Sequence, residues 1–477
     1  PAEVFACFAE INKIPRPSKK EEKMIEFLKN YGEKLGLETK VDEVGNVIIR
    51  KPATKGYEDR ETTVIQSHMD MVCEKDSNIE FDFMNDPINT EVDGEWLKAK
   101  GTTLGADDGI GVAMELAVLK DDSIEHGPLE CVFTRDEETQ LTGASGMKSG
   151  FMTGKYLLNL DSEDEGEIFI SCAGGASTKA VFHFNMEEAP KDYYFFKVGI
   201  SGLTGGHSGD DIEKKRANAN KLLVRFFYNE MKKFDLRISD IQSGGLHNAI
   251  PRDGWAVCAV PMKDKENIRI DANVYVSEIE EEYSVTEKSL KFYVESADAA
   301  DVIEKECAKK IIASLQAVDN GVFAMSQDID WLVETSSNLA SIHKNGNEIE
   351  IVTSQRSNIG SARKNMSATV AAAFELGGAE VFTTDGYPGW KLNPDSELLK
   401  LAVDSYKRLF NKEPKVLAIH AGLECGLFSE RYPHMDMVSF GPTLRGVHSP
   451  EEKLLIPTVE KVWDFLLEIL KNIPKKK

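Results

Sequence analysis

The sequence predicts an α/β protein with a mostly parallel mixed sheet flanked by helices, and a second, α+β domain inserted into it. Strand-like apolar runs alternate with helix-length segments in the first part of the chain, a pattern typical of a largely parallel sheet. The middle of the chain changes to longer strands of period two, with helical segments between and after them. The first pattern returns near the end of the chain, which indicates that the middle segment is an insertion.

Residues 1–185 are expected to form the first part of the main domain. Met24, Leu28 and Tyr31 recur with helical spacing, which predicts an amphipathic helix from residue 20 onward. The segment 110–119 (IGVAMELAVL) is apolar over the length of a helix. Strands are expected at residues 41–50, 63–66, 129–133 and 156–160.

Residues 186–390 are expected to form an inserted α+β domain of the lid or dimerisation type, and residues 391–477 the second part of the main domain. A break at residues 185–192 (NMEEAPKD) marks the start of the insertion, whose length exceeds that of a minimal lid and therefore predicts two lobes. Its expected strands are 194–199, 255–260, 272–276 and 348–353, and its expected helices are 213–233, 302–317 and 360–376. In the last part, helices are expected at 396–410 and 458–473, and strands at 415–419 and 435–440.

Composition and charge exclude some partners. The chain has 57 Lys and Arg against 80 Asp and Glu, a formal net charge of −23, which argues against nucleic acid or an anionic membrane as a partner. No apolar run reaches the roughly 20 residues that a membrane-spanning helix needs. The 7 cysteines are widely spaced and form no Cys-x-x-Cys pair, so we expect reduced thiols and a cytoplasmic location.

Metal-competent side chains follow several of the predicted strands. In an open parallel sheet, ligands collect at the carboxyl ends of the strands, so these side chains are expected to converge on one crevice. They are His68 and Asp70 in TTVIQSHMD, Asp107 and Asp108 in LGADDGIG, Glu137 and Glu138 in CVFTRDEE, Asp161 in YLLNLD, and His448 in GVHSP.

The chemistry of this set favours a catalytic metal centre. Imidazoles and carboxylates without a thiolate suit zinc, manganese or cobalt better than a structural zinc, and their number suits two ions that share one bridging carboxylate. Asp70 lies two residues after His68 on an extended chain, so it can accept a hydrogen bond from that imidazole. Of the adjacent Glu137 and Glu138, one can bind a metal while the other serves as general base.

Other binding motifs fail on inspection. Residues 143–149 (GASGMKS) lack the Gly-Lys-Ser/Thr of a phosphate-binding loop. The segment that begins at Asp161 resembles half a calcium loop, but Cys172 occupies the position where a bidentate glutamate is needed. A calcium-binding or phosphate-binding protein is therefore disfavoured.

Motifs along essentially the whole chain resemble those of the aminoacyl-histidine (Xaa-His, or beta-alanyl-histidine) dipeptidases. This family belongs to the two-zinc exopeptidases, together with aminoacylases and glutamate carboxypeptidases. The resemblance implies a zinc-exopeptidase catalytic domain with an inserted lid, two Zn²⁺ ions for which Co²⁺ or Mn²⁺ can substitute, and hydrolysis of small dipeptides. It rests on HMDMVCEKD, GTTLGADDGIGVA, TRDEETQLTGASG, NLDSEDEGEI, GGHSGDDI, NAIPR, TSQRSN, HAGLECG and GVHSPEE.

The resemblance also implies a role for each matching residue. In the main domain, Glu137 would be the general base, Asp70 would orient His68, and the peptide between Asp107 and Asp108 would be cis. In the lid, His207 would contact the tetrahedral intermediate, and Asn248 and Arg356 would hold the substrate, with the arginine on its free carboxylate. His420 and Glu424, in the last part of the chain, would lie near the site. The metal ligands would be His68 and Asp161 on one zinc, Glu138 and His448 on the other, and Asp107 between them.

Alternatives remain open at this stage. Another two-zinc exopeptidase, such as a tripeptidase, an aminoacylase or a carboxypeptidase, would carry the same metal motifs. A non-catalytic metal-binding or peptide-binding protein is a second alternative, which the intact Glu137 argues against. The sequence is compatible with a monomer or a homodimer, and His207 could act in its own chain or in a partner's site.

Overall fold

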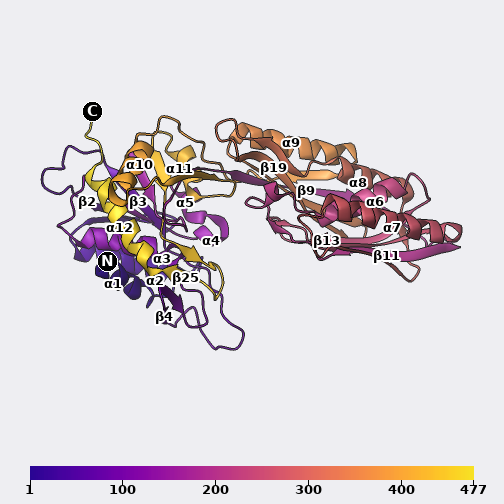
Figure 1. Ribbon diagram of the computed structural model, residues 1–477, viewed down its shortest axis with the longest axis horizontal. Helices are drawn as coiled ribbons and strands as arrows, with labels where there is room; N and C mark the ends of the chain where they lie inside the picture. Colours follow the sequence, from indigo (N-terminus) through magenta and orange to yellow (C-terminus); the bar gives the residue numbers. More distant parts are fainter. The chain divides into compact units, whose positions relative to one another are not determined.

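The computed structural model describes residues 1–477 and divides the chain into two compact units (Figure 1). The main unit comprises Pro1–Ser171, Trp390–Ala418 and Leu423–Lys477, and the inserted unit comprises Cys172–Gly389 and Ile419–Gly422. The sequence-based boundary at residue 186 differs from this division. Strand β9 (Gly174–His183) already belongs to the inserted unit, because it pairs along its whole length with a strand of that unit's sheet.

The main unit is built on an eight-stranded mixed sheet with the order β1-β2-β6-β3-β7-β23-β8-β22. Its centre is parallel, because β3 pairs in parallel with β6 and β7, and β7 with β23. Antiparallel strands lie toward the edges, so the predicted mixed α/β sheet is confirmed. The strands are β1 (Glu38–Val41), β2 (Val47–Lys51), β3 (Thr63–His68), β6 (Leu129–Thr134), β7 (Tyr156–Asn159), β8 (Glu167–Cys172), β22 (Lys415–Ile419) and β23 (Asp436–Ser439).

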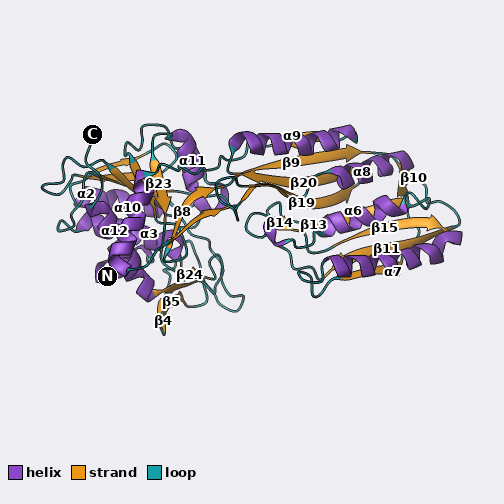
Figure 2. Ribbon diagram, turned by 45° about the horizontal axis from the view of Figure 1, so that its top comes forward, coloured by secondary structure: helices purple, strands orange, loops and turns teal.

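Helices cover this sheet, and their apolar side chains form the hydrophobic core together with those of the strands (Figure 2). Helix α3 (Ala106–Lys120) is buried over almost its whole length and packs against β3 and α1, as its apolar sequence predicts for a core helix. A small sheet joins β4 (Thr90–Asp93), β5 (Trp96–Ala99), β24 (Leu444–Arg445) and β25 (Lys453–Leu455). The other helices are α1 (Ala2–Ile11), α2 (Glu22–Lys34), α4 (Glu137–Gln140), α5 (Thr142–Gly146), α10 (Glu397–Phe410), α11 (Glu424–Arg431) and α12 (Ile456–Lys471).

The inserted unit contains one continuous antiparallel sheet with the order β16-β11-β15-β13-β19-β20-β9-β21, and β18 pairs with β19 beside this path. Strands β13 and β19 pair only between residues 242–244 and 341–343, so the sheet has two halves with a narrow junction. One hydrophobic core nevertheless spans both halves. The strands are β11 (Tyr193–Ser201), β13 (Arg237–Gly244), β15 (Gly254–Pro261), β16 (Lys291–Ser296), β18 (Gly321–Met325), β19 (Val333–Asn345), β20 (Glu348–Ser357) and β21 (Glu380–Thr383).

Four longer helices pack along this sheet (Figure 2). One prediction is wrong here, because residues 272–276, expected to be a strand, lie inside helix α7. The buried residues of α7 recur at the spacing of a helix, and this pattern extends over the whole segment. The strand-like alternation of residues 272–276 is shorter and does not decide the structure. The buried residues are Ile268, Ala272, Tyr275 and Ile279. The helices are α6 (Ala219–Glu230), α7 (Lys265–Glu282), α8 (Lys305–Ala317) and α9 (Gly360–Leu376), and the short elements are β10 (Met186–Glu187), β12 (Gly206–His207), β14 (Ala249–Ile250), β17 (Val302–Ile303), η1 (Ile212–Lys214) and η2 (Met262–Asp264).

Two further expectations can be compared with the structure. No disulfide joins any of the seven cysteines, in agreement with the predicted reduced thiols. None of the helices combines the length and the apolar character that crossing a membrane requires.

Candidate active site

The carboxyl ends of β3, β6 and β7 bring the first half of the candidate site together. His68 is the last residue of β3 and lies opposite Thr134, the last residue of β6. Its Nε2 lies 3.1 Å from Asp107 Oδ1 and 3.4 Å from Asp161 Oδ1. The carboxylate of Glu137 is 3.9 Å from the same nitrogen. The convergence expected from the strand ends is thus present in the main unit.

The second imidazole completes the cluster from the far end of the chain. His448 Nε2 lies 3.0 Å from Asp107 Oδ2 and 2.9 Å from Glu138 Oε2. Asp107 therefore faces one imidazole with each of its carboxylate oxygens. That arrangement has the geometry of a carboxylate that bridges two ions.

The donor set fits divalent cations. Two groups of side chains could each hold a metal ion, because the ligand atoms within each group lie within 4.8 Å of one another. One group is His68, Glu137 and Asp161, and the other is His68, Asp107 and Glu138. All donors are nitrogen or oxygen, the set that suits a catalytic zinc, manganese or cobalt ion. Burial raises the pKa of Asp161 well above its usual range, and Asp107 adds to this rise although His68 opposes it. A cation among these acids would offset that cost.

Asp70 contacts both the His68 ring and the backbone of Glu137. Its Oδ1 lies 3.3 Å from His68 Nδ1, and the same oxygen accepts a hydrogen bond of 3.0 Å from the backbone N–H of Glu137. Ser18 Oγ donates to the other oxygen at 2.7 Å. Although burial opposes ionisation, the bonds from His68 and these other donors hold the pKa of Asp70 below its usual range. This geometry fits the predicted orienting role, which stays a prediction.

Sequence reasoning missed Glu452, which holds the loop that carries Asp107. Its carboxylate oxygens accept four consecutive backbone hydrogen bonds, of 2.9 Å from Leu104, 3.0 Å from Gly105, 3.0 Å from Ala106 and 3.3 Å from Asp107. The Asp107–Asp108 peptide in this loop is cis, as the resemblance implied. The GVHSPEE motif contains Glu452, but nothing in the sequence shows which backbone groups lie opposite it.

A buried arginine fixes the same loop from its other side. Arg16 is almost completely buried and donates hydrogen bonds of 2.8 Å to the Gly105 carbonyl and 3.1 Å to the Ile11 carbonyl. Glu452 thus accepts hydrogen bonds from the N–H groups of residues 104–107, and Arg16 donates one to the carbonyl of Gly105 in the same turn. The position of Asp107 between the two imidazoles therefore depends on side chains from both ends of the chain.

Three buried polar side chains are hydrogen-bonded in a row next to His68 and Asp161. Asn159 Nδ2 donates to Gln66 Oε1 at 2.7 Å, and Gln66 Nε2 donates to Glu424 Oε2 at 2.7 Å. Gln66 precedes His68 by two residues on β3, and Asn159 precedes Asp161 by two residues at the end of β7. These hydrogen bonds therefore connect the strands that carry His68 and Asp161, and they place Glu424 beside β3.

A second group of acids is structural. Glu21, Asp70 and Asp136 place one oxygen each within 4.8 Å of one another. Asp136 accepts hydrogen bonds from the Thr139 and Thr142 hydroxyls. Glu21 accepts from the backbone N–H of Asp136 at 2.9 Å and pairs with Arg135. Because donors of the chain itself satisfy these carboxylates, the group supports the loop and needs no ion.

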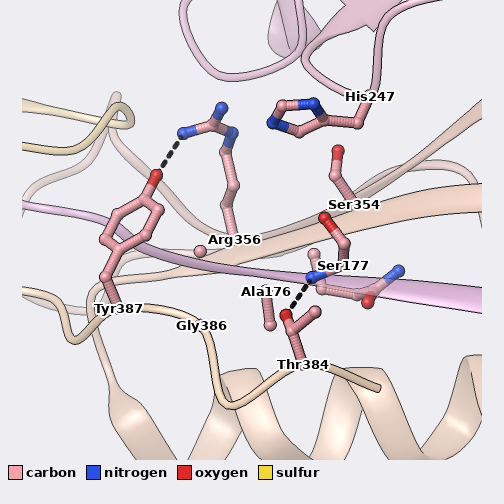
Figure 3. A pocket seen from close by; sticks show the side chains of 10 residues that line it. Ala176, Ser177, His247, Ser354, Arg356, Thr384, Gly386 and Tyr387 are labelled. Atoms are coloured by element: carbon pink, nitrogen blue, oxygen red, sulfur yellow. Dashed lines mark hydrogen bonds between the residues drawn. The ribbon is translucent and has the colours of Figure 1, made fainter. Parts of the chain in front are cut away.

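The inserted unit gathers a separate cluster around Arg356. Arg356 Nη2 lies 3.5 Å from His207 Nε2, and Nη1 donates to the Tyr387 hydroxyl at 3.1 Å (Figure 3). His420 Nε2 lies 2.7 Å from Ser336 Oγ, and Ser336 is directly opposite Arg356 in the β19–β20 pair. The predicted residues His207, Arg356 and His420 thus belong to one cluster.

Asn248 adjoins this cluster through the backbone. Its carbonyl accepts a hydrogen bond of 2.8 Å from Ser208 N, next to His207. Burial and the nearby Arg356 lower the pKa of His207, and the same two causes lower the pKa of His420 to about 3. The imidazoles beside the guanidinium are therefore neutral near pH 7.

The fold and the main-unit cluster together define a class of protein. An α/β sheet with imidazoles and carboxylates at its strand ends, interrupted by an inserted α+β unit, is the arrangement of a metallopeptidase. Residues 64–472 match the family model described as peptidase family M20/M25/M40. The chain belongs to this family and is a hydrolase that acts on peptides.

Two relatives resemble the chain over its whole length. It is 42% identical over 478 residues to the cytosol non-specific dipeptidase of Escherichia coli (strain K12), an alignment that covers 100% of this chain and 98% of the relative. The crystal structure of aminoacylhistidine dipeptidase from Vibrio alginolyticus superimposes with a TM-score of 0.94 at 41% identity, and the match covers 100% of this chain and 98% of that one. The resemblance stated from the motifs is confirmed.

A more distant structure shares the fold. A tripeptidase from Staphylococcus aureus has a TM-score of 0.58 at 16% identity, and the match covers 99% of this chain and 98% of that one. At that identity, the likeness concerns the fold alone.

Proposed function

We propose that the protein is a dipeptidase whose main unit binds two zinc ions and whose inserted unit binds the free carboxylate of the substrate. The observation that carries this proposal is the position of Asp107, with one oxygen 3.1 Å from His68 and the other 3.0 Å from His448. The full-length similarity to two dipeptidases supports the substrate class. The name of the Escherichia coli relative and the absence of disulfides support a cytoplasmic location.

Each ion would have its own ligands and share Asp107. His68 and Asp161 would hold one ion, and His448 and Glu138 the other, with Co²⁺ or Mn²⁺ as possible substitutes for Zn²⁺. When bound, two such ions polarise the scissile carbonyl and make water acidic enough to be deprotonated near pH 7.

Glu137 would act as the general base. It would take a proton from the attacking water and later deliver it to the leaving amine. Burial raises the pKa of its carboxyl well above the usual range, and Asp161 and Glu138 add to this rise while His68 opposes it. Asp70 would support the step, because it accepts one hydrogen bond from the Glu137 backbone N–H and its carboxylate contacts the His68 ring.

His207 would donate a hydrogen bond to the oxyanion. Its Nδ1 accepts hydrogen bonds of 3.2 Å from the backbone N–H groups of Gly209 and Asp210, which favours the tautomer with the ring hydrogen on Nε2. A neutral ring in this tautomer presents one N–H donor, which is what a developing oxyanion needs. Arg356 would bind the C-terminal carboxylate through its fork of donors, with Asn248 and His420 beside it.

A substrate panel tests the proposal. The zinc-loaded protein should hydrolyse dipeptides, with Ala-Ala and beta-alanyl-histidine in the panel. It should leave the C-terminally amidated dipeptide intact, because the carboxylate that Arg356 binds is missing. Efficient cleavage of tripeptides or N-acetyl amino acids, with dipeptides untouched, would contradict the dipeptidase assignment and favour another exopeptidase of the same family.

A further inference from the structure

A small pocket lies beside Arg356, entirely within the inserted unit. It encloses about 210 Å³ and is lined by residues of β9 and β20, the loop that follows β21, and His247. Figure 3 shows its polar lining, in which Ser177, Ser354 and Thr384 contribute hydroxyls. No acidic side chain lines the pocket, and Arg356 is its only formally charged residue.

The register of two strands builds this lining. Ser354 lies opposite Ser177, and Arg356 lies opposite Gly175, in the antiparallel β9–β20 pair. Alternate residues of a strand face the same side, so both hydroxyls share a face with the guanidinium. Gly175 leaves room for the side chain of Tyr387, the hydrogen-bond partner of Arg356, since a Cβ there would lie 2.7 Å from the Tyr387 hydroxyl oxygen.

One hydroxyl in this pocket has no partner within the protein. Ser354 is only 5% exposed, and its Oγ makes no hydrogen bond. A buried polar group without a partner is costly, so a bound group that donates to it or accepts from it gains affinity. In Figure 3 the Ser354 hydroxyl points to the same side of the sheet as the ring of His247. Burial and Arg356 lower the pKa of His247, which leaves a neutral ring that can donate and accept.

We propose that this pocket receives the side chain of the substrate's C-terminal residue, and that it favours side chains that form hydrogen bonds over aliphatic ones. The inference rests on the proposed dipeptidase function, in which Arg356 binds the neighbouring carboxylate. The pocket volume is sufficient for a side chain as large as an imidazole. An aliphatic side chain of the same size also fits, but it leaves the Ser354 hydroxyl unpaired, and this difference creates the selectivity.

The nearly isosteric pair Ala-Thr and Ala-Val tests the inference with the full-length zinc-loaded protein. The wild type should cleave Ala-Thr with a kcat/KM about tenfold higher than Ala-Val, the expected effect of one satisfied buried hydroxyl. Ser354→Ala should bring this ratio close to one, mainly through a higher KM for Ala-Thr. Ser177→Ala removes the facing hydroxyl and should lower the ratio by a smaller factor.

Ser243→Ala is the matched control. Ser243 is also a buried serine on a strand of the inserted unit, but it lines a different cavity. This variant should keep the wild-type ratio, and thermal unfolding should show that all three variants are folded. A ratio that is unchanged in Ser354→Ala, or reduced equally in Ser243→Ala, would overturn the inference and leave the dipeptidase function intact. If the wild type cleaves neither dipeptide, the proposed function itself fails, and the inference fails with it.

Discussion

The main unit and the inserted unit carry polar clusters of opposite character. In the main unit, the carboxylates of Asp107, Glu138 and Asp161 crowd around His68 and His448. In the inserted unit, the guanidinium of Arg356 lies beside neutral imidazoles and hydroxyls. The first cluster suits the binding of cations, and the second suits the binding of a carboxylate and an oxyanion. This difference is the basis for the proposal that the main unit binds the metal ions and the inserted unit binds the substrate carboxylate.

The clusters also differ in how the chain holds them. The proposed metal ligands of the main unit lie at or just beyond the ends of strands and at the starts of helices, and the buried carboxylates of Glu452 and Asp70 hold these segments through backbone N–H groups. Arg356 lies within an antiparallel strand, and Ser336 and Gly175 flank it on the neighbouring strands. Functional side chains beyond the ends of strands need such supporting contacts to hold their position. A functional side chain within a strand is positioned by the register of the sheet.

The largest expected effect belongs to Glu137 in the main unit. Glu137→Gln keeps the shape of the side chain but cannot accept a proton, so kcat should fall about a thousandfold. The metal content should stay at the wild-type level, because Glu137 is not among the proposed ligands. Steady-state kinetics together with metal analysis checks both statements. Activity close to wild type would remove Glu137 from its role as base.

A substitution of Arg356 tests whether the inserted unit binds the substrate carboxylate. Arg356→Ala should raise KM for dipeptides about 100-fold, since it removes charge-assisted hydrogen bonds to the carboxylate, and should leave the metal content unchanged. Arg225→Ala provides a control, because Arg225 pairs with Glu282 on the exposed surface of the same unit. A normal KM in Arg356→Ala would contradict the division between the two units.

Glu452 is expected to act through the position of Asp107. Glu452→Gln replaces an acceptor oxygen by an amide that faces backbone N–H donors, so metal affinity should fall about 10- to 100-fold. Metal titration with a competing chelator measures this loss, and added metal should restore most of kcat. Glu451→Gln, at the exposed neighbouring position, should bind metal as the wild type does. Equal affinities of the two variants would show that the four backbone hydrogen bonds do not position the ligand.

The smallest effect concerns a buried acid outside both clusters. Burial, with a contribution from Asp271, raises the pKa of Glu230 to about 7 from 4.5, although Lys233 opposes the rise. A raised pKa in the folded state means that the protonated carboxyl stabilises the fold below pH 4.5, and this contribution is lost as the pH rises toward 7.

Glu230→Gln should therefore match the wild type at pH 5 and be more stable by about 1 kcal/mol at pH 8. Denaturant unfolding at the two pH values, with catalytic activity as a control, measures this difference. The same difference at both pH values would show that Glu230 does not titrate between them.

The sequence predicted the main-unit cluster well because its residues follow recognisable strands. His68, Glu138 and Asp161 each come shortly after a buried apolar run, and parallel strands end at the same edge of a sheet. The supporting residues gave no such signal. Glu452 bonds backbone groups more than three hundred residues away, and Gln66 bonds Glu424 across a similar separation, so only the fold shows them.

The inserted unit was harder to predict for the same physical reason. Residues 272–276 alternate like a strand locally, yet helical burial over the whole of α7 decides their structure. The pocket beside Arg356 depends on the register of β9 against β20, which places Ser354 opposite Ser177. Register between distant strands is a tertiary property, and neither composition nor local periodicity contains it.

The number of zinc ions bound by the intact protein tests the central claim most directly. After equilibration with zinc and removal of free metal, elemental analysis should find two ions per chain in the wild type and in Arg356→Ala. Asp107→Ala should hold less than one ion, because the shared ligand of both is missing. One ion or none in the wild type, or the loss of metal in Arg356→Ala, would contradict the assignment of metal binding to the main unit and substrate binding to the inserted unit.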